Sequence, residues 1–194
     1  MIKDKVIAVC GGAFNPPTMA HYALYEATKS VVTFDHFIYV PMSDDYPKEG
    51  LVKGHHRVNM LKAMTETHPD IIIEDIELKS PFKGTYQTLK SLQETYQSTI
   101  LLVLGTDQAK TLKHWIEPEK LLSTFLFVVI ERQEKWRDIL TQDTFLKAHA
   151  SRFIDVPLNL NIASSDYRQE RNKAILHPRV EAYIKKHQLY EDPL

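Results

Sequence analysis

The fold is decided by residues 6–21, which read VIAVCGGAFNPPTMAH. The first five are apolar and mostly β-branched or small, a pattern typical of a strand buried on both faces of a sheet. Two glycines follow, and then Asn15 and two prolines. Because a residue that precedes proline avoids the α region, we expect a helix to begin only near Thr18. The stretch therefore predicts a strand, a turn with room for a ligand, and a helix.

Similar apolar runs recur along the chain and predict the rest of a parallel sheet. They cover residues 36–41, 99–105, 125–131 and 152–157, with a weaker run at 71–73. Helical patterns separate them at residues 22–30, 54–66, 85–96 and 118–123. Because strands alternate with helices, the expected fold class is α/β, a Rossmann-like doubly wound parallel sheet of five to six strands with helices on both faces.

The end of the sequence predicts a small helical part. Residues 166–189 favour two short helices, interrupted at His177-Pro178. The chain has 194 residues, which is enough for one domain with a sizeable core. We therefore expect a single domain over residues 1–194, with a C-terminal helical subregion from about residue 164.

The composition is ordinary for a soluble globular protein. Twenty-four basic residues against 25 acidic ones give a formal net charge of −1, which argues against a broad surface for nucleic acid. The single cysteine, Cys10, excludes an internal disulfide and is expected to be a packed core thiol in a reducing compartment. We see neither a signal-peptide pattern nor a membrane-spanning stretch, so the expected location is cytoplasmic, with no membrane partner. A homo-oligomer stays open.

The ends of the predicted strands indicate where a ligand would bind. In open parallel sheets ligands lie beyond the carboxyl ends of the strands, and most of these ends carry small or polar residues here. They are Gly11-Gly12, Pro41-Met42-Ser43, Gly105-Thr106-Asp107, Glu131-Arg132 and, after the last strand, Ser164-Ser165.

The first of these ends favours a polyphosphate. Its glycines let the backbone approach a ligand closely, and a helix N-terminus near Thr18 attracts an anion. Thr18 and His21 are three residues apart, so they share one side of the first helical turn. In the alternative interpretation, Thr18 only caps the helix and His21 is a surface residue.

The same stretch resembles the (H/T)xGH signature of the nucleotidylyltransferase superfamily. Residues 162–168, IASSDYR, resemble its second signature, ISSTxxR, in the expected order along the chain. Within the superfamily the resemblance is closest to bacterial nicotinate-nucleotide adenylyltransferase. Its elements GGTFDPxH, SYTxxTL, GxD…W and a terminal LY are similar to residues 11–18, 84–89, 105–115 and 189–190. The resemblance covers nearly the whole chain.

The resemblance implies an ATP site at the start of the first helix. Thr18 and His21 would hold the ATP phosphates, with His21 stabilising charge at the α-phosphate, and Arg168 would complete the catalytic group. The other residues implied for ATP binding are Gly11, Gly12, Ala13, Phe14, Lys48, Ser164 and Ser165. Mg²⁺ would be carried by ATP, and we expect no metal ligands from the protein.

The resemblance also implies a site for a pyridine mononucleotide. Thr85, Tyr86 and Trp115 would bind it, Asp107 would contact the nucleotide sugar, and Gly105 belongs to the same element. The implied reaction transfers AMP from ATP to nicotinate or nicotinamide mononucleotide and forms a dinucleotide and pyrophosphate in NAD biosynthesis. Such a transfer needs no covalent nucleophile, because positioning and charge neutralisation supply the catalysis.

Three residues depart from the two signatures. Ala20 replaces the glycine of (H/T)xGH, and a methyl group pressed against a nucleotide costs on the order of 1–3 kcal/mol. Ala163 and Asp166 depart from ISST. Ala20 and Asp166 support one alternative, a catalytically weak nucleotide-binding protein. A second alternative is a sibling transferase with another acceptor such as phosphopantetheine.

Two other classes of site are disfavoured by the sequence. It lacks the GxSxG elbow of a serine hydrolase. His55 and His56 are adjacent, so we expect their side chains to diverge on a helix, and one cysteine provides no thiolate cluster for zinc.

Overall fold

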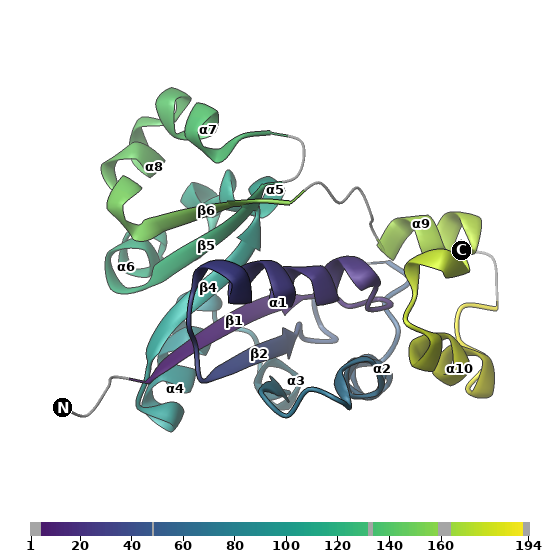
Figure 1. Ribbon diagram of the computed structural model, residues 1–194. Coiled ribbons are helices and arrows are strands. Elements are labelled where there is room, and N and C mark those ends of the chain that lie inside the picture. The colour runs from purple at the N-terminus through teal and green to yellow at the C-terminus, as the bar shows by residue number, and fades with distance from the viewer. Residues whose placement is uncertain (1–4, 48, 132–133, 159–163, 192–194) are drawn as a thin grey trace.

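The computed structural model describes residues 5–47, 49–131, 134–158 and 164–191, and shows one sheet with helices packed on both faces (Figure 1). The sheet has six strands in the order β3-β2-β1-β4-β5-β6, and every neighbouring pair is parallel. This is the strand order of doubly wound dinucleotide-binding folds, and it confirms the expected fold class. The strands are β1 (Val6–Gly12), β2 (His36–Pro41), β3 (Ile71–Ile73), β4 (Thr99–Gly105), β5 (Leu126–Glu131) and β6 (Phe153–Pro157).

The helices fall into two layers, one on each face. The first layer holds α1 (Met19–Val31), α2 (Gly54–Thr65), α9 (Ser164–Glu170), the 3-10 turn η3 (Lys173–Ile175) and α10 (Pro178–Lys186). The second holds α4 (Thr85–Tyr96), α5 (Thr106–Ala109), η1 (Leu112–His114), α6 (Pro118–Thr124), α7 (Trp136–Gln142) and α8 (Thr144–Ala148). The remaining short elements are α3 (Ile76–Lys79) and η2 (Ala150–Arg152).

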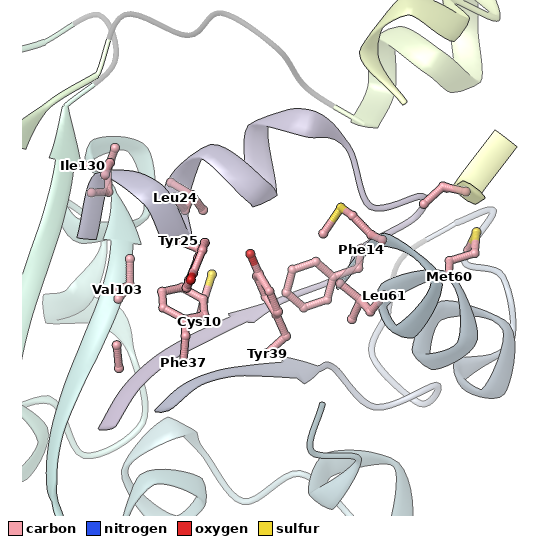
Figure 2. Close-up of a cluster of buried hydrophobic side chains, with 14 of the residues drawn as sticks. Cys10, Phe14, Leu24, Tyr25, Phe37, Tyr39, Met60, Leu61, Val103 and Ile130 are labelled. Atoms are coloured by element: carbon pink, nitrogen blue, oxygen red, sulfur yellow. The ribbon is translucent and has the colours of Figure 1, made fainter. Parts of the chain in front are cut away.

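Alternation along the strands divides the buried side chains into two cores. In β1, Ala8 and Cys10 face the core shared with α1, whereas Ile7 and Val9 face the core shared with α4. The α1-side core contains aromatic rings packed edge to face: Phe37 lies 5.0 Å from Tyr39 between ring centroids and 5.5 Å from Tyr25 (Figure 2). Because both faces of each central strand are covered, the strands read as continuous apolar runs in the sequence.

Most elements predicted from the sequence are found within a few residues of their expected bounds. The α1 helix begins at Met19 after Thr18, Cys10 is 3% exposed, and Pro178 is the first residue of α10. Four helices were not predicted: α3, α5, α7 and α8. Three of them, α3, α5 and α8, span four or five residues, which is too short for a helical period to show, and α7 spans seven.

None of the helices in the described part of the chain is long and apolar enough to cross a membrane.

Truncation of the central aromatic cluster tests the packing of the α1-side core. Phe37 is 0% exposed, so Phe37→Ala is expected to lower the free energy of unfolding by about 3 to 5 kcal/mol. Val31→Ala, at a 50% exposed position of α1, is the control and is expected to change it by less than about 0.5 kcal/mol. Urea denaturation followed by circular dichroism measures both. Equal effects of the two changes would contradict this account of the core.

Candidate functional site

The site lies where the strand order reverses, at the carboxyl ends of β1 and β4. The chain leaves β1 toward α1 on one face and leaves β4 toward α5 on the other, so a crevice opens between the two strand ends. Gly11 and Gly12 end β1 in register with Val40 and Pro41 of β2. The backbone of the two glycines therefore lies at the end of β1, between the α1 side and the α4 side of the sheet.

The turn after β1 is built around Phe14. Its φ of 48° is in the left-handed region, and its ring is buried at 1% exposure. The ring packs edge-on against Tyr39, with centroids 5.4 Å apart (Figure 2). It packs edge-on against His21 as well, with centroids 5.0 Å apart. A Cβ atom at Gly12 would approach this ring to 3.2 Å. Gly12 therefore lets the Phe14 ring close the core directly beneath the backbone that a ligand would approach.

Thr18 and His21 lie together at the start of α1, as their spacing predicts. The Thr18 N–H donates to Nδ1 of His21 at 2.9 Å, and the Thr18 Oγ1 lies 3.0 Å from the same nitrogen. An Nδ1 that accepts a backbone hydrogen bond places the proton of a neutral imidazole on Nε2. The carbonyl of His21 is held in turn by the buried Tyr39 hydroxyl, which donates to it at 2.7 Å.

Residues from α9 join this end of α1, although they follow it by about 150 positions. Ser164 Oγ donates to the carbonyl of Pro16 at 2.8 Å, and Arg168 donates to the carbonyl of Asn15 at 2.6 Å. Thr18, His21, Ser164 and Arg168 thus form one cluster, which we call the polar corner. The two signatures at opposite ends of the sequence meet in it.

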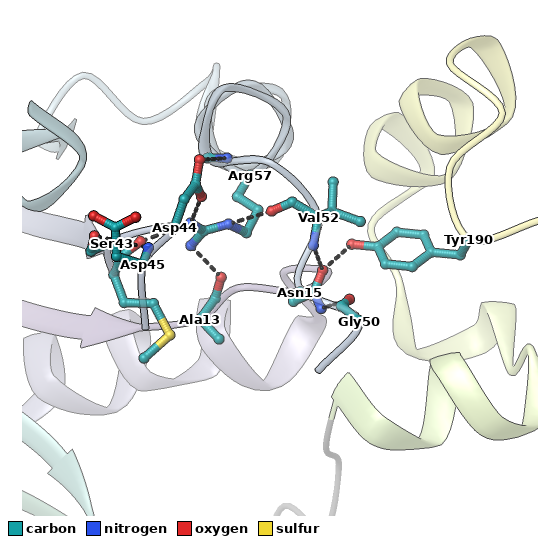
Figure 3. Close-up of polar contacts among 11 residues, drawn as sticks. Ala13, Asn15, Ser43, Asp44, Asp45, Gly50, Val52, Arg57 and Tyr190 are labelled. Atoms are coloured by element: carbon teal, nitrogen blue, oxygen red, sulfur yellow. Dashed lines mark hydrogen bonds and ion pairs between the residues drawn. The ribbon is translucent and has the colours of Figure 1, made fainter. Parts of the chain in front are cut away.

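The buried Arg57 of α2 ties the loops around the site together (Figure 3). Its side chain is 0% exposed and donates to the carbonyls of Ala13, Met42 and Val52 and to Oδ1 of Asp44. Burial disfavours ionisation of Asp44, but the Gly54 N–H and the Arg57 guanidinium together hold the pKa of this carboxyl below its usual value. Arg57 therefore fixes the loop after β1 relative to the loop after β2.

A cavity of about 640 Å³ opens on the α4 side of the β1 end. This volume lies within the range of small-molecule sites. Gly11, Gly12, Thr85 and Trp115 are the predicted site residues that line it. Trp115 is held by a hydrogen bond from its Nε1 to Thr111 Oγ1 at 2.9 Å.

Gly84, the residue before α4, shapes the mouth of this cavity. Its φ is 103°, and a Cβ atom there would lie 2.9 Å from Cβ of Ile116, itself on the cavity wall. A glycine is therefore required at this close approach of two loops.

The acidic side chains among the described lining residues are Asp45 and Glu77. His114 also lines the cavity, whereas no described lining residue is a lysine or an arginine. Thr88 Oγ1 donates to Glu77 Oε1 at 2.8 Å, but the dominant effect is burial, which raises the pKa of Glu77. The cavity consequently suits a ring or sugar better than a phosphate group.

Several predicted site residues lie away from the cavity wall. Tyr86 packs against Phe125, with centroids 6.0 Å apart, and beneath the Lys120 ammonium. Gly105 is buried at the end of β4, and Asp107 is exposed in the first turn of α5. None of these three is among the residues that line the cavity. Their proposed roles remain predictions.

Other predicted residues fall outside the description. Lys48, Arg132 and residues 159–163, which include Ala163, lie outside the described residues, as does the side chain of Ser165. Of the two departures that are described, Ala20 is 4% exposed and does not line the cavity. Asp166 lies in the first turn of α9, where a carboxylate interacts favourably with the helix dipole.

The expectation that His55 and His56 diverge is wrong. Their ring centroids lie 4.0 Å apart, and His56 Nδ1 is 3.0 Å from the hydroxyl of Tyr183 in α10. Packing of α10 on α2 draws the His56 ring aside. Within the described ranges we find no group of three or more His, Cys, Asp or Glu side chains placed to hold a metal ion.

Four residues of the site were missed from the sequence: Asn15, Arg57, Glu77 and Tyr190. Asn15 is 0% exposed and contacts three separate segments, and Tyr190 is one of its partners. The signal available for Asn15 was its place inside the first motif, but only the fold shows what its side chain bonds. Arg57 carried no signal beyond a charge within the predicted helix 54–66. Glu77 lay outside every predicted helix, a few residues after the weak strand run 71–73.

Known proteins are similar to this chain in sequence and in fold. Residues 9–170 match the model of the family described as Cytidylyltransferase-like. A protein named "Probable nicotinate-nucleotide adenylyltransferase" from Acholeplasma laidlawii is 29% identical over 190 residues, covering 96% of this chain and 98% of the relative. One of the same name from Oceanobacillus iheyensis is 26% identical over 194 residues, covering 96% and 97%.

Solved structures show the same fold. Plasmodium falciparum nicotinic acid mononucleotide adenylyltransferase complexed with NaAD is 26% identical and superposes with a TM-score of 0.81, covering 96% of this chain and 98% of that one. The same protein complexed with APC gives a TM-score of 0.78 at 25% identity, with the same coverage.

The buried carboxyl of the cavity gives a pH-dependent prediction. Because the folded-state pKa of Glu77 is raised, the folded protein holds this proton to higher pH than the unfolded chain does. The free energy of unfolding should therefore fall as the pH rises from about 4.3, the ordinary pKa of glutamate, through the raised value. Glu77→Gln keeps an acceptor for Thr88 but cannot ionise, so it should gain stability relative to wild type over that window.

Chemical denaturation between pH 4 and pH 8 measures this difference. Glu94→Gln, whose side chain is 69% exposed, controls for the loss of one negative charge. A stability difference between Glu77→Gln and wild type that stays constant from pH 4 to pH 8 would refute the assignment.

Proposed function

The chain belongs to the cytidylyltransferase-like family, and from that premise we propose that it transfers AMP from ATP to a pyridine mononucleotide, with nicotinate mononucleotide the first candidate. The products would be a dinucleotide and pyrophosphate, as in a step of NAD biosynthesis. The observation that supports this most is the arrangement of the polar corner and the 640 Å³ cavity on the two sides of Gly11-Gly12. Two substrates that must be joined can then meet over the end of β1.

The two halves of the site differ in chemistry, which supports the assignment of substrates. The described cavity wall carries aromatic and threonine side chains and no lysine or arginine, so it suits the ring and ribose of the mononucleotide. The polar corner carries Arg168, His21 and the N-terminal turn of α1, all of which favour phosphate oxygens. The names of the relatives and of the solved structures agree with nicotinate as the acceptor base.

The proposed reaction is one displacement at phosphorus. A phosphate oxygen of the mononucleotide attacks the α-phosphorus of ATP, a P–O bond forms, and the bond to pyrophosphate breaks. His21, with its proton on Nε2, would donate a hydrogen bond to an α-phosphate oxygen. Arg168 uses one of its five N–H donors on the Asn15 carbonyl, which orients its guanidinium for the triphosphate. Bound to ATP, Mg²⁺ would neutralise charge on the phosphates.

We further propose that the enzyme acts in the cytoplasm and that residues 1–194 form a single domain. A homo-oligomer is a candidate assembly for it.

Removal of His21 or Arg168 tests this proposal. Pyrophosphate release is measured with ATP, Mg²⁺ and each acceptor in turn: nicotinate mononucleotide, nicotinamide mononucleotide and phosphopantetheine. We expect turnover with a pyridine mononucleotide and a loss of roughly 10²- to 10³-fold in kcat for His21→Ala and for Arg168→Ala, because each removes a charge-stabilising donor.

Matched controls are available on the surface. His55→Ala and Arg179→Ala remove an exposed imidazole and an exposed guanidinium away from the polar corner and should leave turnover unchanged. Turnover with phosphopantetheine alone would instead favour the sibling transferase. Nucleotide binding without turnover of any acceptor would favour a catalytically weak binding protein, and either result would overturn the proposal.

A further inference from the structure

Asn15 is the point at which three distant segments of the chain meet (Figure 3). Its Nδ2 donates to the carbonyl of Gly50 at 2.8 Å, and its Oδ1 accepts from the Val52 N–H at 3.2 Å. The same Oδ1 accepts from the hydroxyl of Tyr190 at 2.8 Å, and the Asn15 carbonyl accepts from Arg168 at 2.6 Å. One residue therefore connects the loop before α2, helix α9 and the segment after α10.

The position of Asn15 makes these bonds consequential. Its side chain is 0% exposed, so water cannot replace a partner that is lost. Asn15 comes directly before the Pro16 carbonyl bonded by Ser164, and it stands three residues before Thr18. A displacement of Asn15 would therefore move Arg168 and the start of α1 together.

Tyr190 supplies an uncharged hydroxyl donor to the buried Asn15 side chain. Burial raises the pKa of its hydroxyl above the usual tyrosine range, so the group stays protonated and acts as a donor. Its ring packs edge-on against Tyr167 of α9, with centroids 5.8 Å apart. A phenylalanine at this position would keep the ring contact and remove only the donor to Asn15.

We propose that Tyr190 is a positioning residue for the triphosphate of ATP, acting through Asn15 on Arg168 and on the Thr18–His21 turn. This inference rests on the proposed function, since it assumes that the polar corner binds phosphates. The inference concerns ATP rather than the mononucleotide. Asn15, Arg168 and Tyr190 do not line the cavity, so the mononucleotide should be indifferent to the Tyr190 hydroxyl.

The α10 helix itself offers a matched control. The hydroxyl of Tyr183 also joins the C-terminal part to the rest of the fold, accepting from Asn59 Nδ2 at 3.1 Å and lying 3.0 Å from His56 Nδ1. Tyr183 and Tyr190 are both partly buried, but Tyr183 bonds α2 rather than the turn after β1. Tyr183→Phe therefore loosens the docking of α10 without touching Asn15.

The experiment compares Tyr190→Phe with Tyr183→Phe in steady-state kinetics and in thermal unfolding. For Tyr190→Phe we expect the KM for ATP to rise about tenfold, with a smaller fall in kcat, and the KM for the mononucleotide to stay within about twofold of wild type. For Tyr183→Phe we expect both KM values to match wild type at a comparable shift of Tm. Equal kinetic effects of the two changes, or equal effects of Tyr190→Phe on both KM values, would show a merely structural role and overturn the inference.

Binding of a non-hydrolysable ATP analogue separates this inference from the proposed function. Calorimetry with the analogue alone requires no acceptor. A tenfold loss of affinity in Tyr190→Phe, in a protein that turns over no pyridine mononucleotide, would reject the proposed reaction and support the positioning role. Unchanged affinity in Tyr190→Phe would reject the positioning role, whatever the acceptor. A wild-type protein that does not bind the analogue would reject both.

Discussion

The site depends on a buried positive charge, the guanidinium of Arg57. It bonds the carbonyls of Ala13, Met42 and Val52, which belong to the loops after β1 and β2, and it pairs with the carboxylate of Asp44. Removing a cation from water is costly unless its donors are satisfied, so these loops can close only in the arrangement that provides all four acceptors. Both loops are thereby tied to one side chain of α2, and Asn15 adds bonds to Gly50 and Val52. Arg57 therefore also fixes the turn that carries Asn15, and with it the start of the helix that carries His21.

The fold could be predicted from the sequence to a large extent, because its central strands are covered on both faces. Residues such as Ile7 and Val9 on one side and Ala8 and Cys10 on the other leave no polar position in β1, and a continuous apolar run is the strongest local signal a strand can give. Short helices such as α3 and α5 escaped prediction because one turn shows no period. These helices depend on contacts between loops that lie far apart in the sequence.

The site was predicted unevenly, for a physical reason. Thr18 and His21 act on each other across one helical turn, so their spacing alone predicts their contact. Arg168 and Tyr190 reach Asn15 across 153 and 175 positions, and the contact is visible only after folding. The adjacent histidines were misjudged because helix geometry alone was considered, whereas Tyr183 and His187 of the C-terminal part also surround the His56 ring. Local geometry predicts local contacts, and tertiary packing decides the others.

The bond between Asn15 and Tyr190 has a consequence for the order in which the protein is made. At about 5–20 residues per second, a ribosome would add Tyr190 roughly 9 to 35 seconds after Asn15. The core on the α4 side uses no described residue beyond Phe153, so it can form on the nascent chain, whereas the α1-side core still lacks Val180 and Ile184. During this interval the Asn15 side chain can bond Gly50 and Val52, but its Oδ1 still lacks the Tyr190 hydroxyl. The set of hydrogen bonds around Asn15 is therefore completed only when nearly all of the described chain has been made.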